Sequence, residues 1–134
     1  MNTVAFPGVV TALAVLVYTL FTMNAGRNRV KYKIAAPAVT GSEGYERAYR
    51  VQMNTLEHLV IFLPSLWLYG YSQSHEIAAY IGLAWIVGRI LYGVGYISEP
   101  AKRGPGMFIT LGTELWLLLG GLYGFTMLML MLKS

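Results

Sequence analysis

The chain has 134 residues, of which 56% are hydrophobic and only 12% are charged. Ordinary soluble domains are about 45 to 50% apolar and about 25% charged, and a small soluble domain needs a large polar surface. The composition therefore excludes a water-soluble globule, and also intrinsic disorder, collagen and nucleic-acid-binding tails. The formal net charge is +4, but in a membrane protein the placement of charge matters more than its sum. The absence of Cys excludes disulfides, thiolate metal sites and a thiol nucleophile of the protein's own.

Four apolar stretches are each close to the ~20 residues that cross a bilayer as a helix. In chain order, the predicted spans are residues 4–23, 46–71, 77–97 and 107–132. Together they form a single four-helix membrane domain. The first span has no charge and no preceding Lys or Arg, so we expect it to be retained rather than cleaved as a signal peptide. Pro, Gly and polar residues predict loops at residues 24–47 and 98–106, and a short turn at 72–76.

The two longer loops lie on one side of this arrangement, and the short turn and both termini lie on the other. The first side carries seven basic residues: Arg27, Arg29, Lys31, Lys33, Arg47, Lys102 and Arg103. The other side carries Lys133 alone. The positive-inside rule places the basic loops in the cytoplasm, and some of these charges also hold lipid headgroups.

Polar residues within the spans gather toward the basic loops. The second span has Arg47, Arg50, Asn54 and Glu57 within a stripe of about 80°, the third has Arg89, Tyr92 and Tyr96, and the fourth has Glu114. An ionisable group at bilayer depth costs at least about 2.5 to 3.5 kcal/mol, so it normally faces a partner or water and marks function. The pattern predicts a polar chamber whose excess of arginine favours an anionic ligand.

Simpler interpretations stay open for single residues in this set. Glu57 could pair with Arg50, or Glu114 with Arg89, only to join helices. The two tyrosines of the third span could belong to an interfacial aromatic belt.

Two further features are interpreted structurally. His58 is expected to pack or to form a hydrogen bond rather than to bind a metal, because no second His lies within ligand spacing; no metal is assigned. Gly120 and Gly124 form a small-xxx-small step that allows close helix packing.

The segment 46–57 carries a pattern that is quite specific: Glu46, Arg47, Arg50, Gln52, Asn54 and Glu57. It resembles the signature of the MAPEG family, the membrane-associated proteins in eicosanoid and glutathione metabolism. The spacing of Arg89, Tyr92 and Tyr96, followed by Arg103, is similar to the second block of that family. The likeness covers nearly the whole chain, and is greatest to the branch of the microsomal glutathione transferases and leukotriene synthases.

The resemblance implies an all-α integral membrane protein, a homotrimer that holds glutathione between neighbouring subunits near the cytosolic face. By position, the implied glutathione contacts are Arg29, Arg50, Gln52, Asn54, Glu57, His58, Tyr92 and Tyr96. Arg103 matches the arginine that activates the thiol. Val30 and His58 replace an arginine and a tyrosine of the leukotriene synthases, which argues against leukotriene synthesis but leaves glutathione binding intact.

The residue chemistry agrees with that ligand. Glutathione has two carboxylates, one ammonium and one thiol. Arg29 and Arg50, with Arg89 as a further candidate, suit the carboxylates, and Glu57 suits the ammonium. Arg103 can stabilise a thiolate but cannot act as a base. The expected activity is that of a glutathione transferase, with peroxidase activity as a further option. The second substrate is an apolar electrophile or a lipid hydroperoxide that arrives through the bilayer.

Two other function classes are alternatives for this sequence. A non-enzymatic lipid-binding scaffold of the same family would not need the full set of polar residues. A small multidrug exporter would need an acidic residue in the first span, which has none. The compact chain and the lack of an obvious C-terminal retention signal favour a bacterial inner membrane, with the active site facing the cytoplasm.

Overall fold

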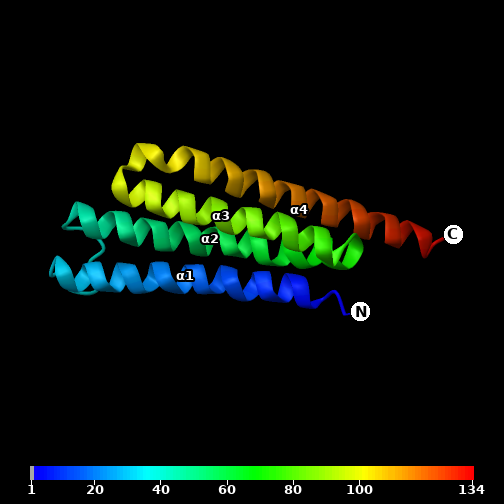
Figure 1. The fold of residues 1–134 in the computed structure, drawn as a ribbon, viewed down its shortest axis with the longest axis horizontal. Helices are drawn as coiled ribbons and strands as arrows, with labels where there is room; N and C mark the ends of the chain where they lie inside the picture. Colours follow the sequence, from blue (N-terminus) through cyan, green and yellow to red (C-terminus); the bar gives the residue numbers. More distant parts are fainter. Residues whose placement is uncertain (1) are drawn as a thin grey trace.

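The computed structural model describes residues 2–134, which form an elongated bundle of four long helices and no strand (Figure 1). The helices are α1 (Ala5–Lys31), α2 (Glu43–Ser72), α3 (His75–Ser98) and α4 (Gly104–Met131), and a short 3-10 helix, η1 (Pro100–Arg103), precedes α4. α2 and α3 pack against each other, and both also contact α1 and α4. The predicted all-α bundle is confirmed.

The first helix is longer than the sequence pattern predicts. α1 continues to Lys31, so the expected loop at residues 24–47 is wrong at both ends, and the connection to α2 covers residues 32–42. The apolar run ends near residue 23, but the helix does not, because the following polar residues contain no proline. The side chain of Asn28 donates a hydrogen bond to the Asn24 carbonyl inside this extension, at 2.8 Å.

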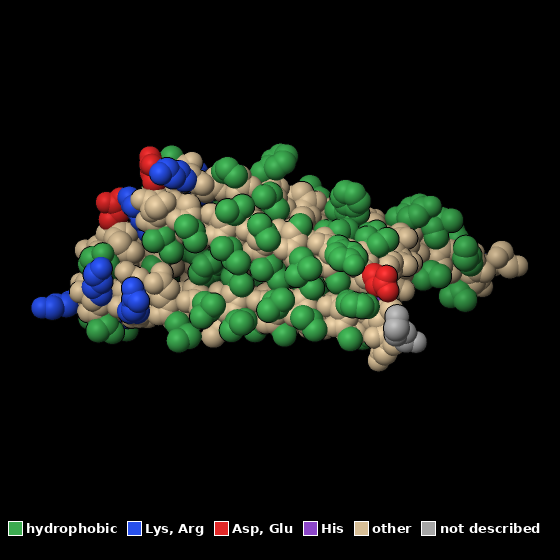
Figure 2. Space-filling view, in the orientation of Figure 1, with side chains coloured by type: hydrophobic (Ala, Val, Ile, Leu, Met, Phe, Trp, Pro, Cys, Tyr) green, Lys and Arg blue, Asp and Glu red, His purple; other side chains and the backbone are tan. Residues whose placement is uncertain are grey.

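The outer surface of the bundle is that of a membrane protein. Large apolar side chains are exposed along all four helices, while charged groups gather at the end that holds the 32–42 connection (Figure 2). α1, α3 and the Pro100–Met131 segment are each long and apolar enough to cross a bilayer. α2 is long enough, at 30 residues, but its first half carries most of the polar side chains. Both termini lie at the opposite end (Figure 1).

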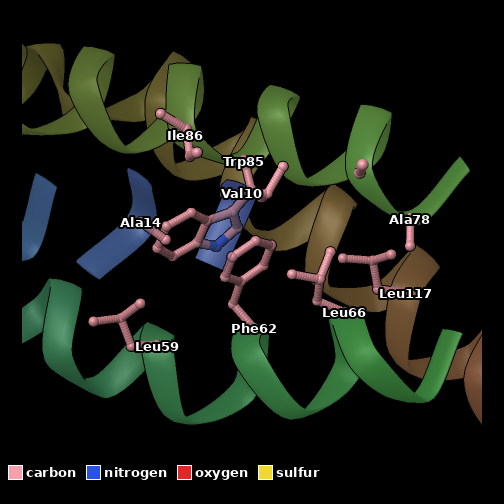
Figure 3. Close-up of a cluster of buried hydrophobic side chains, with 10 residues drawn as sticks. Val10, Ala14, Leu59, Phe62, Leu66, Ala78, Trp85, Ile86 and Leu117 are labelled. Carbon is pink, nitrogen blue, oxygen red and sulfur yellow. The ribbon is translucent and has the colours of Figure 1, made fainter. Parts of the chain in front are cut away.

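The apolar core is centred on two stacked aromatic rings. Phe62 of α2 lies parallel to Trp85 of α3, with ring centroids 4.0 Å apart and planes 6° apart. Val10 of α1 and Leu117 of α4 belong to the same cluster (Figure 3). All four helices therefore contribute to one core.

Glycine allows α4 to approach its neighbours closely. A Cβ at Gly120 would overlap the Tyr69 ring, and one at Gly124 would overlap the Ser72 side chain, which confirms the packing role predicted for this step. Gly106 is the tightest position, because a Cβ there would lie 2.6 Å from the Gly88 carbonyl oxygen and would also overlap the backbone of Tyr92.

We predict that Gly106→Ala lowers the free energy of unfolding by about 1 to 3 kcal/mol, the usual cost of overpacking, because the obstructing atoms belong to the backbone. Gly112→Ala is the matched control on the same helix, where a Cβ would have nothing within 4 Å. This control should leave the free energy of unfolding unchanged or raise it by up to about 1 kcal/mol, because Ala has a higher helix propensity than Gly. Thermal unfolding in detergent measures both; equal melting temperatures would contradict the packing argument.

Candidate functional site

The polar stripe predicted on the second helix divides into a buried part and an exposed part. Asn54 is buried, whereas the side chains of Arg50 and Glu57 are 49% and 54% exposed. Nη1 of Arg50 lies 3.3 Å from Oε1 of Glu57, so this expected ion pair is present. Gln52, from the same signature, is half-buried. In a single chain the predicted chamber is thus an open face of α2, not an enclosed cavity.

Behind this face, Arg89 of α3 is completely buried. Its Nη2 donates to Oδ1 of Asn54 at 2.8 Å and to Oγ1 of Thr55 at 2.7 Å. The guanidinium lies 4.3 Å from the centroid of the Tyr92 ring. Its Nε and Nη1 have no hydrogen-bond partner in residues 2–134. Arg89 therefore fixes the orientation of Asn54 and joins α3 to α2.

Glu114 of α4 has a different partner from the one considered in the sequence. Nδ1 of His58 lies 2.9 Å from both of its carboxylate oxygens, and Nε1 of Trp85 donates to Oε1, also at 2.9 Å. Arg89 makes no hydrogen bond or salt bridge to Glu114. His58 is thus a hydrogen-bonding residue, as its isolated position predicted, and it is turned toward α4.

The remaining aromatic and basic residues of the predicted site lie toward the same end of α3 and α4. Tyr92 is buried, so it is not part of an interfacial belt, and Tyr96 is half-buried with its ring centroid 5.7 Å from that of Tyr92. Arg103 in η1 is exposed, and its Nη1 donates to the Pro100 carbonyl at 3.0 Å. η1 therefore holds an arginine at the charged end of the bundle.

Two of the predicted cations are engaged within the chain. Arg29 donates to the carbonyls of Ile34 and Ala38 and to the hydroxyl of Tyr45, so it ties the 32–42 connection to α2. Arg47 pairs with Glu43 and donates to carbonyls at the end of α3. The first-loop contact implied for Arg29 would compete with these bonds. Among the arginines of the predicted site, Arg50 and Arg103 are exposed.

Sequence reasoning missed Thr55 and Trp85, which hold Arg89 and Glu114 respectively. Thr55 lies within the polar 46–57 segment and Trp85 in an apolar stretch, and each side chain offers a single polar atom. The only signal in the sequence was indirect: a buried charge needs hydrogen-bond partners from a neighbouring helix.

We predict that Thr55→Val lowers the free energy of unfolding by about 1 to 3 kcal/mol, because it removes an acceptor from a buried guanidinium. Thr110→Val is the matched control: Thr110 is equally buried, but its hydroxyl donates only to the Gly106 carbonyl of its own helix. Chemical denaturation in mixed micelles compares the two. A control that is as unstable as Thr55→Val would show that the loss reflects packing.

Comparison with known proteins identifies the family. The sequence model of the MAPEG family matches residues 7–123. The chain is 44% identical to an uncharacterized protein of Synechocystis sp. over 87% of this chain and 85% of that one. It is 38% identical to microsomal glutathione S-transferase 2 of Homo sapiens over 86% and 78% of the two chains, and 34% identical to leukotriene C4 synthase of Cavia porcellus over 87% and 77%. The chain belongs to the MAPEG family.

Proposed function

We propose that this protein is a membrane-bound glutathione transferase, which joins glutathione to apolar electrophiles from the bilayer and also reduces lipid hydroperoxides. Similarity to a microsomal glutathione S-transferase over most of both chains supports this activity. The observation that carries it is the open face of α2, where Arg50 and Glu57 are half-exposed beside a fixed Asn54. A ligand with both signs of charge suits such a face.

Arg50 and Glu57 bind the two ends of glutathione in this proposal. The guanidinium of Arg50 donates to a carboxylate in a forked, charge-assisted contact, and the carboxylate of Glu57 accepts hydrogen bonds from the γ-glutamyl ammonium. Exposed ion pairs contribute only about 0 to 1 kcal/mol. The ligand therefore separates the 3.3 Å pair at little cost. Asn54, held by Arg89, adds a polar contact of fixed direction.

Arg103 activates the thiol by electrostatics. A thiol with an ordinary pKa near 8.5 is only a few per cent ionised at pH 7. A guanidinium held against the sulfur favours the thiolate, and each unit by which the thiol pKa falls corresponds to about 1.4 kcal/mol. Arg103 lies exposed in η1, and within residues 2–134 it donates only to a carbonyl of the same turn, which leaves most of its donors for this contact.

The active form is proposed to be a homotrimer in a bacterial inner membrane. Half-exposed charges on a membrane helix are costly unless a polar surface covers them, and a second subunit supplies that surface. The charged end of the bundle faces the cytoplasm under the positive-inside rule, which gives glutathione access from the aqueous side and the apolar substrate access from the bilayer. A cyanobacterial relative supports the bacterial assignment.

Calorimetric titration of the solubilised protein with glutathione, and with an analogue that lacks the γ-glutamyl amine, tests the proposal. Strong heat with glutathione and weak heat with the analogue are expected, and no heat with either would end the proposal. Binding without turnover of an apolar electrophile would instead favour the lipid-binding scaffold.

We predict that Glu57→Gln weakens glutathione binding by about 1.5 to 3 kcal/mol, the value of a charged hydrogen bond, and leaves the oligomer intact. Glu43→Gln is the matched control, because Glu43 also pairs with an arginine of α2 but lies in its first turn. Calorimetry and mass measurement in mild detergent follow the two effects. If Glu57→Gln disrupts the fold while the molecules that do fold bind glutathione normally, Glu57 is a structural residue.

We predict that Arg103→Leu leaves the dissociation constant of glutathione nearly unchanged but abolishes the ultraviolet thiolate absorbance at neutral pH. Turnover should fall by about two to three powers of ten, as for loss of an electrostatic donor, and should recover in part at higher pH as solvent ionises the thiol. The control is Lys102→Leu, because Lys102 lies in the same turn and pairs with Glu99. A variant at position 103 with full thiolate signal and turnover would exclude this role.

A further inference from the structure

A carboxylate and an imidazole are paired deep within the bundle. The side chain of Glu114 is only 3% exposed, and it receives hydrogen bonds from Nε1 of Trp85 and from Nδ1 of His58. An ionised carboxylate can only accept hydrogen bonds, so Nδ1 of the neutral imidazole carries the proton and Nε2 carries a lone pair. Glu114 therefore selects one tautomer of His58 and one ring orientation.

Nε2 of His58 is available to a ligand. It has no hydrogen-bond partner in residues 2–134, and the atom is not fully buried. The His58 side chain is 12% exposed. His58 lies four residues after Asn54, on the side of Asn54 that is turned away from Arg50 and Glu57. The partly exposed His58 ring therefore lies one helical turn from Asn54, which borders the proposed glutathione face.

A proton on His58 is held beside a carboxylate. The titratable groups of the surrounding elements are Arg89 of α3, which lies within electrostatic range of Glu114, Glu57 and Tyr92, and Tyr18 of α1, which packs against the core cluster that contains Trp85. α4 contributes Glu114 itself. A protonated His58 forms a cation–anion pair with Glu114, which is less costly in a low-dielectric interior than an unpaired charge. The added positive charge also balances a nearby thiolate.

Given the proposed function, we infer that His58 accepts the proton of the glutathione thiol, with Glu114 and Trp85 as positioning residues. The S–H bond breaks, its electron pair stays on sulfur, and the proton forms a bond to Nε2. The same proton is returned to the departing group of the electrophile after the carbon–sulfur bond has formed. Arg103 stabilises the thiolate but cannot take this proton.

Proton counting tests this inference. The solubilised protein is mixed rapidly with glutathione in weak buffer at neutral pH, while thiolate absorbance and a pH-indicator dye are followed together. The native protein should release well under one proton per thiolate, because the proton stays on His58. His58→Gln and Glu114→Gln should release about one, and should form thiolate about ten- to a hundredfold more slowly. Glu76→Gln, an exposed glutamate in the first turn of α3, is the matched control and should behave like the native protein.

Release of one full proton per thiolate by the native protein would overturn the inference. So would Glu114→Gln variants that retain the native proton count and rate, since the pair would then only join α2 to α4. If Glu114→Gln does not fold, the native count and His58→Gln decide the question. Binding heat without the predicted proton retention leaves the glutathione proposal intact, whereas no binding heat in the native protein refutes both.

Discussion

The arrangement of the polar half of this bundle depends on the burial of one guanidinium. Arg89 is completely buried and cannot lose its charge, so neighbouring helices must supply acceptors. Asn54 and Thr55 of α2 accept from it, and Tyr92 presents its ring. A charge left without these partners would cost several kcal/mol. The registration of α2 against α3, and the direction in which Asn54 points, follow from this requirement.

The polar layer and the apolar core meet at Trp85. Its ring stacks on Phe62 within the apolar cluster, while its Nε1 donates to Glu114 in the polar layer. Indole suits such a boundary because most of its surface is apolar and only one atom needs a partner. Packing of the core therefore also sets the position of the Glu114 carboxylate, and through it the orientation of His58. Changes in the apolar core can reach the candidate site by this route.

The sequence was sufficient for the parts of the fold that depend on composition and period. Apolar runs predicted four helices, and spacing placed Arg50, Asn54 and Glu57 on one side of α2. Spacing could not show that Asn54 turns inward while Arg50 remains exposed, because that depends on where α3 packs. It also could not show that Arg29 is bonded to the 32–42 connection, since those acceptors are backbone carbonyls. The extension of α1 was missed because the end of an apolar run marks the membrane boundary, not the end of a helix.

The two ion pairs of the candidate site differ in exposure, and this difference indicates different roles for them. Arg50 and Glu57 are half-exposed and 3.3 Å apart, so a ligand can separate them and take both contacts. His58 and Glu114 are largely buried and 2.9 Å apart, with a third bond from Trp85, so a ligand cannot replace that pair without leaving a carboxylate unsatisfied. The exposed pair is suited to exchange of partners, and the buried pair to exchange of a proton. Both pairs include adjacent residues of α2, Glu57 and His58, so the proposed binding contact and the proposed proton acceptor lie one residue apart on the same helix.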